Sequence, residues 1–142
     1  MIFKKGIHMA YKIFIDGKEG TTGLKIYERF SNRKDIEILQ IDDEKRKDPV
    51  EKAKMINESD LLIFSYPVYT FLAPYQLHKF VSLLKDNKIK LNGKYATQIS
   101  TSKHFYDVTA HRYIQDNCQE LGFKFIKGLS ADMDDLPLEK GQ

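Results

Sequence analysis

Short apolar runs alternate with amphipathic stretches along the whole chain, and this alternation limits the folds open to it. The apolar runs have the length of β-strands, and the stretches between them have the spacing of helices. The predicted strands are residues 11–16, 36–41, 61–65, 94–100 and 123–126. Parallel neighbours in a sheet need a long crossover, which is usually a helix, so this order predicts a parallel sheet.

The predicted helices carry recognisable end signals. A first helix is expected over 22–30, and Asp48 followed by Pro49 suits the start of a second that runs to about residue 57. A third begins near Pro74, and a fourth begins after Asp107 as its N-cap and ends at Gly122. The apolar positions of the last two repeat at helical spacing: Leu77, Phe80, Val81 and Leu84, then Ala110, Ile114, Cys118 and Leu121.

Right-handed crossovers place helices on both faces of such a sheet. We therefore predict an α/β fold of three layers, a doubly wound five-stranded parallel sheet in the order 2-1-3-4-5. Its ligands bind at the carboxyl ends of the strands, where three loops meet, at 17–23, 66–73 and 101–106. The chain ends soon after the fifth strand, so the last helix is expected to be missing. An exposed sheet face would favour association with a second copy.

The composition predicts one domain over 9–142 after a loose leader at 1–8, and it argues against several partners. The net charge of +3 is spread over 23 basic and 20 acidic residues, which indicates a solvated surface and no nucleic-acid partner. No apolar run is long enough to span a membrane. The single cysteine allows no internal disulfide and fits a reducing cytoplasm. Asp132, Asp134 and Asp135 are interpreted as solvated, so no metal is expected.

The first loop, GKEGTTG, has glycines three apart between a strand and a helix. Glycines let backbone N–H groups approach a phosphate, and the helix N-terminus attracts negative charge. The alternative is a tight turn that needs glycine for its geometry alone, and Glu19 is an awkward neighbour for a phosphate. The predicted phosphate-binding residues are Gly17, Gly20, Thr21, Thr22 and Gly23.

The second loop, SYPVYTFLAP, gathers Tyr66, Tyr69 and Phe71 where a loop would overhang a ligand. An aromatic wall on a backbone stiffened by proline suits a planar ring such as isoalloxazine. The alternative is that these rings pack beneath the third helix. The residues predicted to line one side of the ring are Pro67, Val68, Tyr69, Thr70 and Phe71.

The third loop, STSKHFYD, offers hydroxyls, backbone amides and a lysine to the polar edge of a flavin. Positive charge there would favour the anionic reduced form. His104 taken alone is more typical of a surface or packing histidine than of a catalytic one. The residues predicted at the pyrimidine edge are Thr101, Ser102, Lys103, His104, Phe105 and Tyr106.

Residues 60–140 resemble the flavodoxin-like NAD(P)H-dependent oxidoreductase (FMN reductase) family. The resemblance lies in SDLLIFSYPVYTFLAPYQLHKF, KYATQISTSKHFYDVTAHRYIQDNCQELGFK and GLSADMDDL. It implies a flavodoxin-like fold, FMN as cofactor, NAD(P)H as co-substrate and a small-molecule redox substrate. It implies no catalytic acid or base, because the protein positions the rings and tunes their charge while hydride passes to the flavin.

Residues 11–57 are similar instead to the NADP-binding segment of short-type N-acetyl-gamma-glutamyl-phosphate reductase. The similarity lies in YKIFIDGKEGTTGLKIYERFSNRKDIEIL and DDEKRKDP. It implies that the GxxGTTG loop holds a pyrophosphate and that Lys45, Arg46 and Lys47 face an adenosine 2′-phosphate. The alternative for these three charges is a solvated loop.

The chain thus resembles a chimera of two α/β halves joined near 58–61. The arginine-biosynthesis reductase needs a nucleophilic cysteine, but Cys118 lies on the apolar stripe of a helix and is expected to be buried. The favoured prediction is an FMN-binding NAD(P)H-dependent oxidoreductase. The alternatives are an NADP-binding fragment and a folded hybrid that binds no cofactor.

Overall fold

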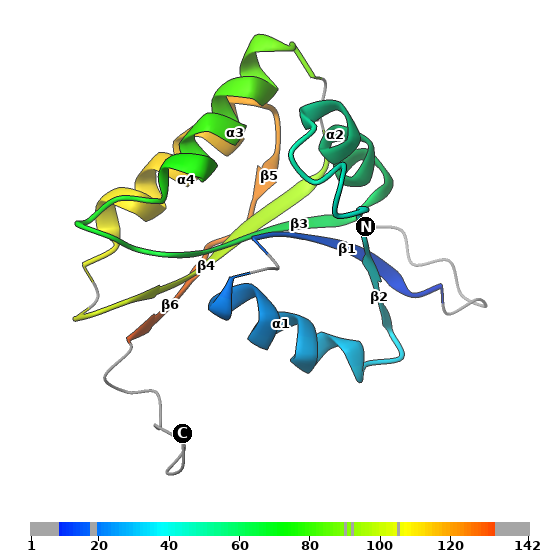
Figure 1. Cartoon of the computed structure of the whole chain (residues 1–142), viewed down its shortest axis with the longest axis horizontal. Helices are drawn as coiled ribbons and strands as arrows, with labels where there is room; N and C mark the ends of the chain where they lie inside the picture. The colour runs from blue at the N-terminus through cyan, green and yellow to red at the C-terminus, as the bar shows by residue number, and fades with distance from the viewer. Residues whose placement is uncertain (1–8, 18–19, 90, 92, 105, 133–142) are drawn as a thin grey trace.

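The computed structural model describes residues 9–17, 20–89, 91, 93–104 and 106–132 and shows one parallel sheet between helical layers (Figure 1). The strands are β1 (Tyr11–Asp16), β2 (Ile36–Leu39), β3 (Leu61–Pro67), β4 (Tyr95–Ser102), β5 (Lys124–Phe125) and β6 (Leu129–Asp132). The helices are α1 (Thr21–Ser31), α2 (Pro49–Glu58), α3 (Tyr75–Asp86) and α4 (Val108–Glu120). The main path of the sheet is β2-β1-β3-β4-β5, so the predicted fold class and strand order are confirmed.

β5 and β6 are two parts of one edge strand. Both β5 and β6 pair with β4, with Tyr95 opposite Lys124 and Ile99 opposite Leu129, so the register shifts by one residue between them. One extra residue in a strand is a bulge, and it interrupts the edge at residues 126–128. Gly128 suits this position because a Cβ there would come within 2.7 Å of the Gln98 carbonyl oxygen. The predicted strand at 123–126 was therefore only its first part.

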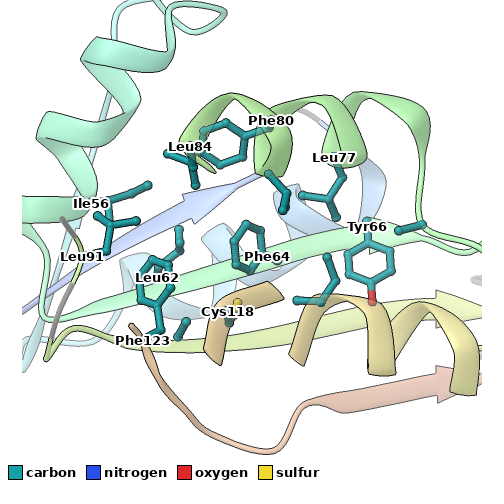
Figure 2. Packing of buried hydrophobic residues seen from close by; sticks show 14 of the residues in the cluster. Ile56, Leu62, Phe64, Tyr66, Leu77, Phe80, Leu84, Leu91, Cys118 and Phe123 are labelled. Atoms are coloured by element: carbon teal, nitrogen blue, oxygen red, sulfur yellow. The ribbon is translucent and has the colours of Figure 1, made fainter. Parts of the chain in front are cut away.

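Each face of the sheet has its own apolar cluster. Figure 1 shows α1 on one face and α2, α3 and α4 on the other. The α1 face buries Ile13, Ile15 and Ile63 against Ile26 of the helix. The opposite face holds the larger cluster, which Figure 2 shows from close by and which includes Ile56, Leu62, Phe64, Tyr66, Leu77, Phe80, Leu84 and Cys118. Alternate residues of β3 enter the two clusters, as the pleat of a strand requires.

All four predicted end signals lie at helix ends: Asp48, Pro74 and Asp107 directly precede α2, α3 and α4, and Gly122 follows α4. The Asp48 side chain accepts a hydrogen bond from the Val50 N–H at 2.9 Å and caps α2. Gly122 follows α4 with φ of +88°, a conformation that favours glycine. Asp107 precedes α4, but its carboxylate makes no capping hydrogen bond. Asp107 is thus the N-cap residue by position, as predicted, but hydroxyl groups of two strands hold its carboxylate in place of a capping hydrogen bond.

Hydrogen bonds connect the two stretches that meet near residues 58–61. The Lys12 N–H donates to Asp60 Oδ2 at 2.8 Å, and the Asp60 N–H donates to the Lys12 carbonyl at 2.7 Å. The Lys94 ammonium group donates to the carbonyl oxygens of Asn57 and Ser59 at 2.5 and 3.1 Å. A cation thus lies at the C-terminal end of α2, where the helix dipole favours it.

The expected leader at 1–8 and the expected loss of a helix after the last strand concern residues 1–8 and 133–142, which lie outside the described residues. Among the helices that the structure describes, none combines the length and the apolar character that crossing a bilayer requires.

Candidate functional site

The three predicted loops meet at the carboxyl ends of β1, β3 and β4, which are neighbours in the sheet. The Thr22 and Thr101 hydroxyl oxygens lie 3.0 Å apart and connect the first loop to the third. The Phe71 and Tyr106 rings meet edge to face with centroids 5.4 Å apart, and they connect the second loop to the third. The structure therefore brings together residues that lie far apart in the sequence.

The start of α1 suits an anion, whereas Gly17 of the same loop serves packing. No side chain of the described residues caps α1 at Gly20, and its first turn contains no acidic residue, so its terminal N–H groups and dipole suit a negative ligand. Gly17 has φ of +86°, and a Cβ there would lie 2.2 Å from the Ser65 carbonyl oxygen. Position 17 therefore requires glycine because the backbone lies so close to β3 there, whatever the loop binds.

Of the other predicted phosphate ligands, Thr22 and Gly23 are buried at the start of α1, and Gly20 is exposed. In the pair formed by Thr22 and Thr101 one hydroxyl donates and the other accepts. The accepting hydroxyl keeps its own hydrogen for a ligand. Residues 18 and 19, and with them the awkward glutamate, lie outside the described residues, and the structure describes only the backbone of Thr21.

The second loop contains a tight turn in a strained conformation. Tyr69 and Leu72 exchange two backbone hydrogen bonds of 3.1 and 3.0 Å, and the residues between them, Thr70 and Phe71, have φ of +50° and +68°. This is the pattern of a type I′ turn, which normally carries asparagine and glycine. A β-branched and an aromatic residue there cost energy, and such strain concentrates at functional sites.

The turn leaves aromatic rings on the surface beside the third loop. Tyr69 is 66% exposed, Phe71 is 54% exposed and Tyr106 is 58% exposed. Exposed aromatic groups in contact are unusual enough to indicate a binding surface. Leu72 and Tyr75 are also exposed next to them, and the sequence reasoning did not include these two. Val68 packs partly against the core, and its N–H donates to the Thr101 carbonyl at 2.9 Å.

Tyr66 does not belong to this aromatic wall. It is 2% exposed, and its hydroxyl donates to Gln98 Oε1 at 2.6 Å inside the core. Burial, with a smaller contribution from the Asp107 carboxylate, raises the pKa of the Tyr66 hydroxyl far above its usual value. The prediction that Tyr66 lines the ligand was therefore wrong, and the alternative of packing beneath the third helix holds for this residue.

The third loop combines strain with an unsatisfied buried hydroxyl. His104 has φ of +57°, its N–H donates to Asp132 Oδ1 at 3.2 Å, and its ring lies against that of Tyr106. Ser102 is 3% exposed, yet its hydroxyl has no hydrogen-bond partner in the described structure. A buried polar atom without a partner calls for an explanation. Lys103 is exposed, and Phe105 lies outside the described residues.

Asp132 is buried and accepts the His104 N–H, so the interpretation of this carboxylate as solvated was wrong. Asp134 and Asp135 lie outside the described residues. Among the residues that are described, no group of three metal-binding side chains occurs.

A polar network lies beneath the third loop, and the sequence reasoning missed it. Asp107 Oδ2 accepts hydrogen bonds from the hydroxyls of Ser100, at 3.0 Å, and Ser130. Ser100 Oγ is 2.7 Å from His111 Nε2, and Gln98 Nε2 donates to the His111 carbonyl. The signal was the alternation in ATQISTS, residues 96–102. Its polar members Gln98, Ser100 and Ser102 lie on the buried face of β4.

The network contains Ser, His and Asp but lacks the geometry of a catalytic triad. Ser100 gives its one hydroxyl hydrogen to Asp107, so His111 Nε2 carries the hydrogen that Ser100 accepts and cannot act as its base. Asp107 lies 3.4 Å from the same nitrogen, not from the opposite side of the ring. A triad requires the carboxylate on the other nitrogen. Burial lowers the pKa of His111, and Asp107 opposes this shift.

An ion pair near the first loop was also missed. Lys52 Nζ lies 2.7 Å from Asp16 Oδ1, both side chains are largely buried, and the ammonium group lies over the Phe80 ring. The carboxylate at the end of β1 is thereby neutralised.

Cys118 is buried, as expected, and burial raises its thiol pKa to about 12, so it is not a nucleophile. The Lys45, Arg46 and Lys47 segment is an exposed turn.

The chain shares sequence with one class of protein over part of its length. No protein-family model matches it. Over 59 residues, 42% of this chain, it is 51% identical to N-acetyl-gamma-glutamyl-phosphate reductase of Chelativorans sp. (strain BNC1), of which the match covers 19%. Over 80 residues, 56% of this chain, it is 42% identical to N-acetyl-gamma-glutamyl-phosphate reductase 2 of Nostoc sp. (strain PCC 7120), of which the match covers 23%. The match thus spans about a fifth of these relatives.

Most of the chain shares its fold with other proteins. An NADPH-quinone reductase from P. pentosaceus aligns with a TM-score of 0.65 at 12% identity, over 87% of this chain and 85% of that one. A flavodoxin mutant from Pseudomonas aeruginosa aligns with a TM-score of 0.64 at 13% identity, over 90% and 87%. General stress protein 14 of Treponema denticola, in complex with FMN, aligns with a TM-score of 0.61 at 12% identity, over 89% and 87%.

Identities this low establish the fold alone. Both resemblances expected from the sequence are confirmed. A part of the chain is similar in sequence to N-acetyl-gamma-glutamyl-phosphate reductase, and the chain has a flavodoxin-like α/β fold.

Proposed function

We propose that the chain binds FMN where the three loops meet and acts as an NAD(P)H-dependent oxidoreductase on a small-molecule redox substrate. One observation carries this proposal: at the carboxyl edge of a doubly wound sheet, an exposed ring of a strained turn contacts the third loop, which in turn contacts Thr22 at the start of α1. That edge is where such sheets bind ligands. The structural relative from Treponema denticola binds FMN, which agrees with this proposal.

The residues present suit a flavin mononucleotide in three respects. The N-terminus of α1 with Gly20 would take the phosphate, because its N–H groups lack a side-chain cap. Tyr69 and Phe71 would cover one side of the planar ring. The buried hydroxyl of Ser102 at the end of β4 would find a partner at the polar edge of the ring.

The bound flavin would supply the redox chemistry, accepting hydride from the nicotinamide. The backbone N–H groups at the start of α1 would bind the phosphate, and side chains of the second and third loops would orient the ring and keep water from one of its faces. None of them is assigned as a catalytic acid or base. Lys103 would add positive charge near the ring edge, which favours a negatively charged ligand.

The test is to add excess FMN to the purified chain, remove unbound flavin and record the visible spectrum. A retained spectrum, shifted from that of free FMN, supports the proposal, and bleaching by NADPH or NADH then measures reduction. A colourless protein rules out FMN. The control is the Tyr95→Ala variant, which removes an exposed aromatic ring at the opposite end of the strands and should leave flavin binding unchanged.

A second candidate is NADP binding through the first loop. The identity with N-acetyl-gamma-glutamyl-phosphate reductase, the uncapped α1 and the exposed basic turn at 45–47 favour it. NADPH fluorescence titrated against the FMN-free chain tests this candidate. Recognition of the 2′-phosphate would be indicated if the Lys45→Gln/Lys47→Gln variant binds NADPH more weakly than the unchanged chain does. The two proteins should then bind NADH equally. Binding of neither cofactor would leave a folded hybrid without one.

A further inference from the structure

A cavity of about 350 Å³ lies on the α4 side of the sheet, between the helix, β4 and the segment that joins β5 to β6. None of the described residues of the first and second loops lines it. It is therefore distinct from the surface on which Tyr69 and Phe71 lie. The lining residues are Gln98, Asp107, Val108, His111, Arg112, Gln115, Phe125, Lys127 and Gly128.

The inner end of the cavity offers hydrogen-bond acceptors. Asp107 is buried, and among the described residues the hydroxyls of Ser100 and Ser130 engage its Oδ2 atom alone. His111 uses Nε2–H toward Ser100, which leaves its Nδ1 atom as an acceptor. A hydroxyl or amine group of a ligand would therefore find partners at this end, whereas a carboxylate would meet the charge of Asp107.

The outer end carries two cations. Arg112 and Lys127 are both exposed, and neither has an ion-pair partner among the described residues. Gln115 lies one helical turn from Arg112 and adds an amide at the mouth. Arginine and lysine together favour a carboxylate or another small anion, to which arginine donates two parallel hydrogen bonds.

The walls between the two ends are apolar or bare. Phe125 and Val108 supply hydrophobic surface. Gly128 packs its backbone directly on Gln98, and a Cβ there would lie 2.3 Å from Gln98 Cγ. The bulge between β5 and β6 thus needs a residue without a side chain at the wall of the cavity. Phe125 can pack against a ring, and the volume lies within the range of small-molecule sites.

We propose that this cavity binds a small ring-bearing carboxylate with a hydroxyl or amine donor at its opposite end. The carboxylate lies between Arg112 and Lys127, the ring lies against Phe125, and the donor reaches Asp107 or His111. The opposite orientation is excluded because it places the anion against Asp107. The site does not depend on the proposed flavin.

The test uses 4-hydroxybenzoate as the probe, with 4-hydroxybenzamide and benzoate as controls that lack the charge and the inner donor respectively. The chain, labelled with ¹⁵N, is titrated with each compound, with and without FMN, and followed by two-dimensional NMR. We expect 4-hydroxybenzoate to bind with a Kd of ~1 mM, with the largest shifts at Gly128, Phe125 and the Gln98 side chain. Both control compounds should bind at least about fivefold more weakly.

The Arg112→Gln/Lys127→Gln variant should lose about tenfold or more in affinity for 4-hydroxybenzoate. The matched control is Lys25→Gln/Arg29→Gln, which removes the same charges from the exposed face of α1 and should bind as the unchanged chain does. Thermal unfolding verifies that both variants fold. The proposal is overturned if no saturable shift appears, if the amide binds as tightly as the acid, or if the shifts centre on Phe71 and Tyr106.

Discussion

At the strained turn Tyr69–Leu72, substitutions of two adjacent residues should affect protein stability and FMN affinity differently. Thr70 has φ of +50° and an exposed side chain that makes no hydrogen bond or ion pair with the described residues, so replacing it loses no such contact. An L-residue in the left-handed region costs about 1–2 kcal/mol, and asparagine tolerates it better than a β-branched residue. We therefore expect Thr70→Asn to raise the free energy of unfolding by about 0.5–1 kcal/mol and to leave FMN affinity unchanged.

Phe71→Gly should give the opposite result. Glycine relieves the strain at φ of +68° by about 1–2 kcal/mol, but the unfolded chain gains about 0.5–1 kcal/mol of entropy. The edge-to-face contact with Tyr106 contributes about 0.5–1.5 kcal/mol and is lost. These contributions cancel to within about 1 kcal/mol, so stability should change little. FMN affinity should fall about tenfold, because one face of the ring loses its cover.

Urea unfolding followed by far-ultraviolet circular dichroism measures both stabilities, since the chain has no tryptophan. The control is Thr109→Asn in the first turn of α4, where the two residues have similar helix propensities and no change is expected. Destabilisation by Thr70→Asn would refute the strain argument. Unchanged FMN affinity in Phe71→Gly would remove this ring from the proposed site.

Four further predictions concern single residues. Tyr69→Ala should weaken FMN binding about tenfold with an unchanged circular dichroism spectrum, and equal affinity would exclude this residue from the ring wall. Gly17→Ala should lower the free energy of unfolding by about 2–4 kcal/mol in a urea titration, because its Cβ would meet the β3 backbone at positive φ; a change below about 1 kcal/mol would contradict the described approach. Because burial lowers the folded-state pKa of His111, its contribution to stability is complete above pH 6.5 and is lost as pH falls through the folded-state pKa. His111→Gln should flatten that part of the plot of unfolding free energy against pH, and an unchanged plot would contradict the lowered pKa of His111. Cys118 should react with a thiol reagent only as the chain unfolds, and rapid labelling of the native protein would show that the thiol is accessible.

The fold could be predicted because its signals are local. Strand-length apolar runs separated by helical spacing leave little choice other than a parallel sheet, and Asp48 and Gly122 acted at the helix ends as their chemistry suggests. The edge strand was predicted only in part, because the bulge at 126–128 is set by packing of Gly128 on Gln98, a contact that the local sequence does not reveal.

The candidate site was predicted at the level of loops, and its errors came from side-chain direction. The predicted third strand ended at residue 65, whereas β3 continues to Pro67. The alternation that buries Leu62 and Phe64 therefore also buries Tyr66. Asp107 has the residue type and position of an N-cap, but the hydroxyls of Ser100 and Ser130 reach it from strands distant in sequence. Such competition between partners appears only once the chain is folded.

The hydrogen bonds around Lys12, Asp60 and Lys94 bear on whether the two stretches of different resemblance can be separated. β1 belongs to the first stretch, yet it lies between β2 of the same stretch and β3 of the second. A fragment that ends at the junction would expose one whole edge of β1 and leave the C-terminal end of α2 without the Lys94 ammonium group. The polypeptide therefore cannot be divided at the junction without loss of these contacts, and the two stretches should unfold in a single cooperative transition.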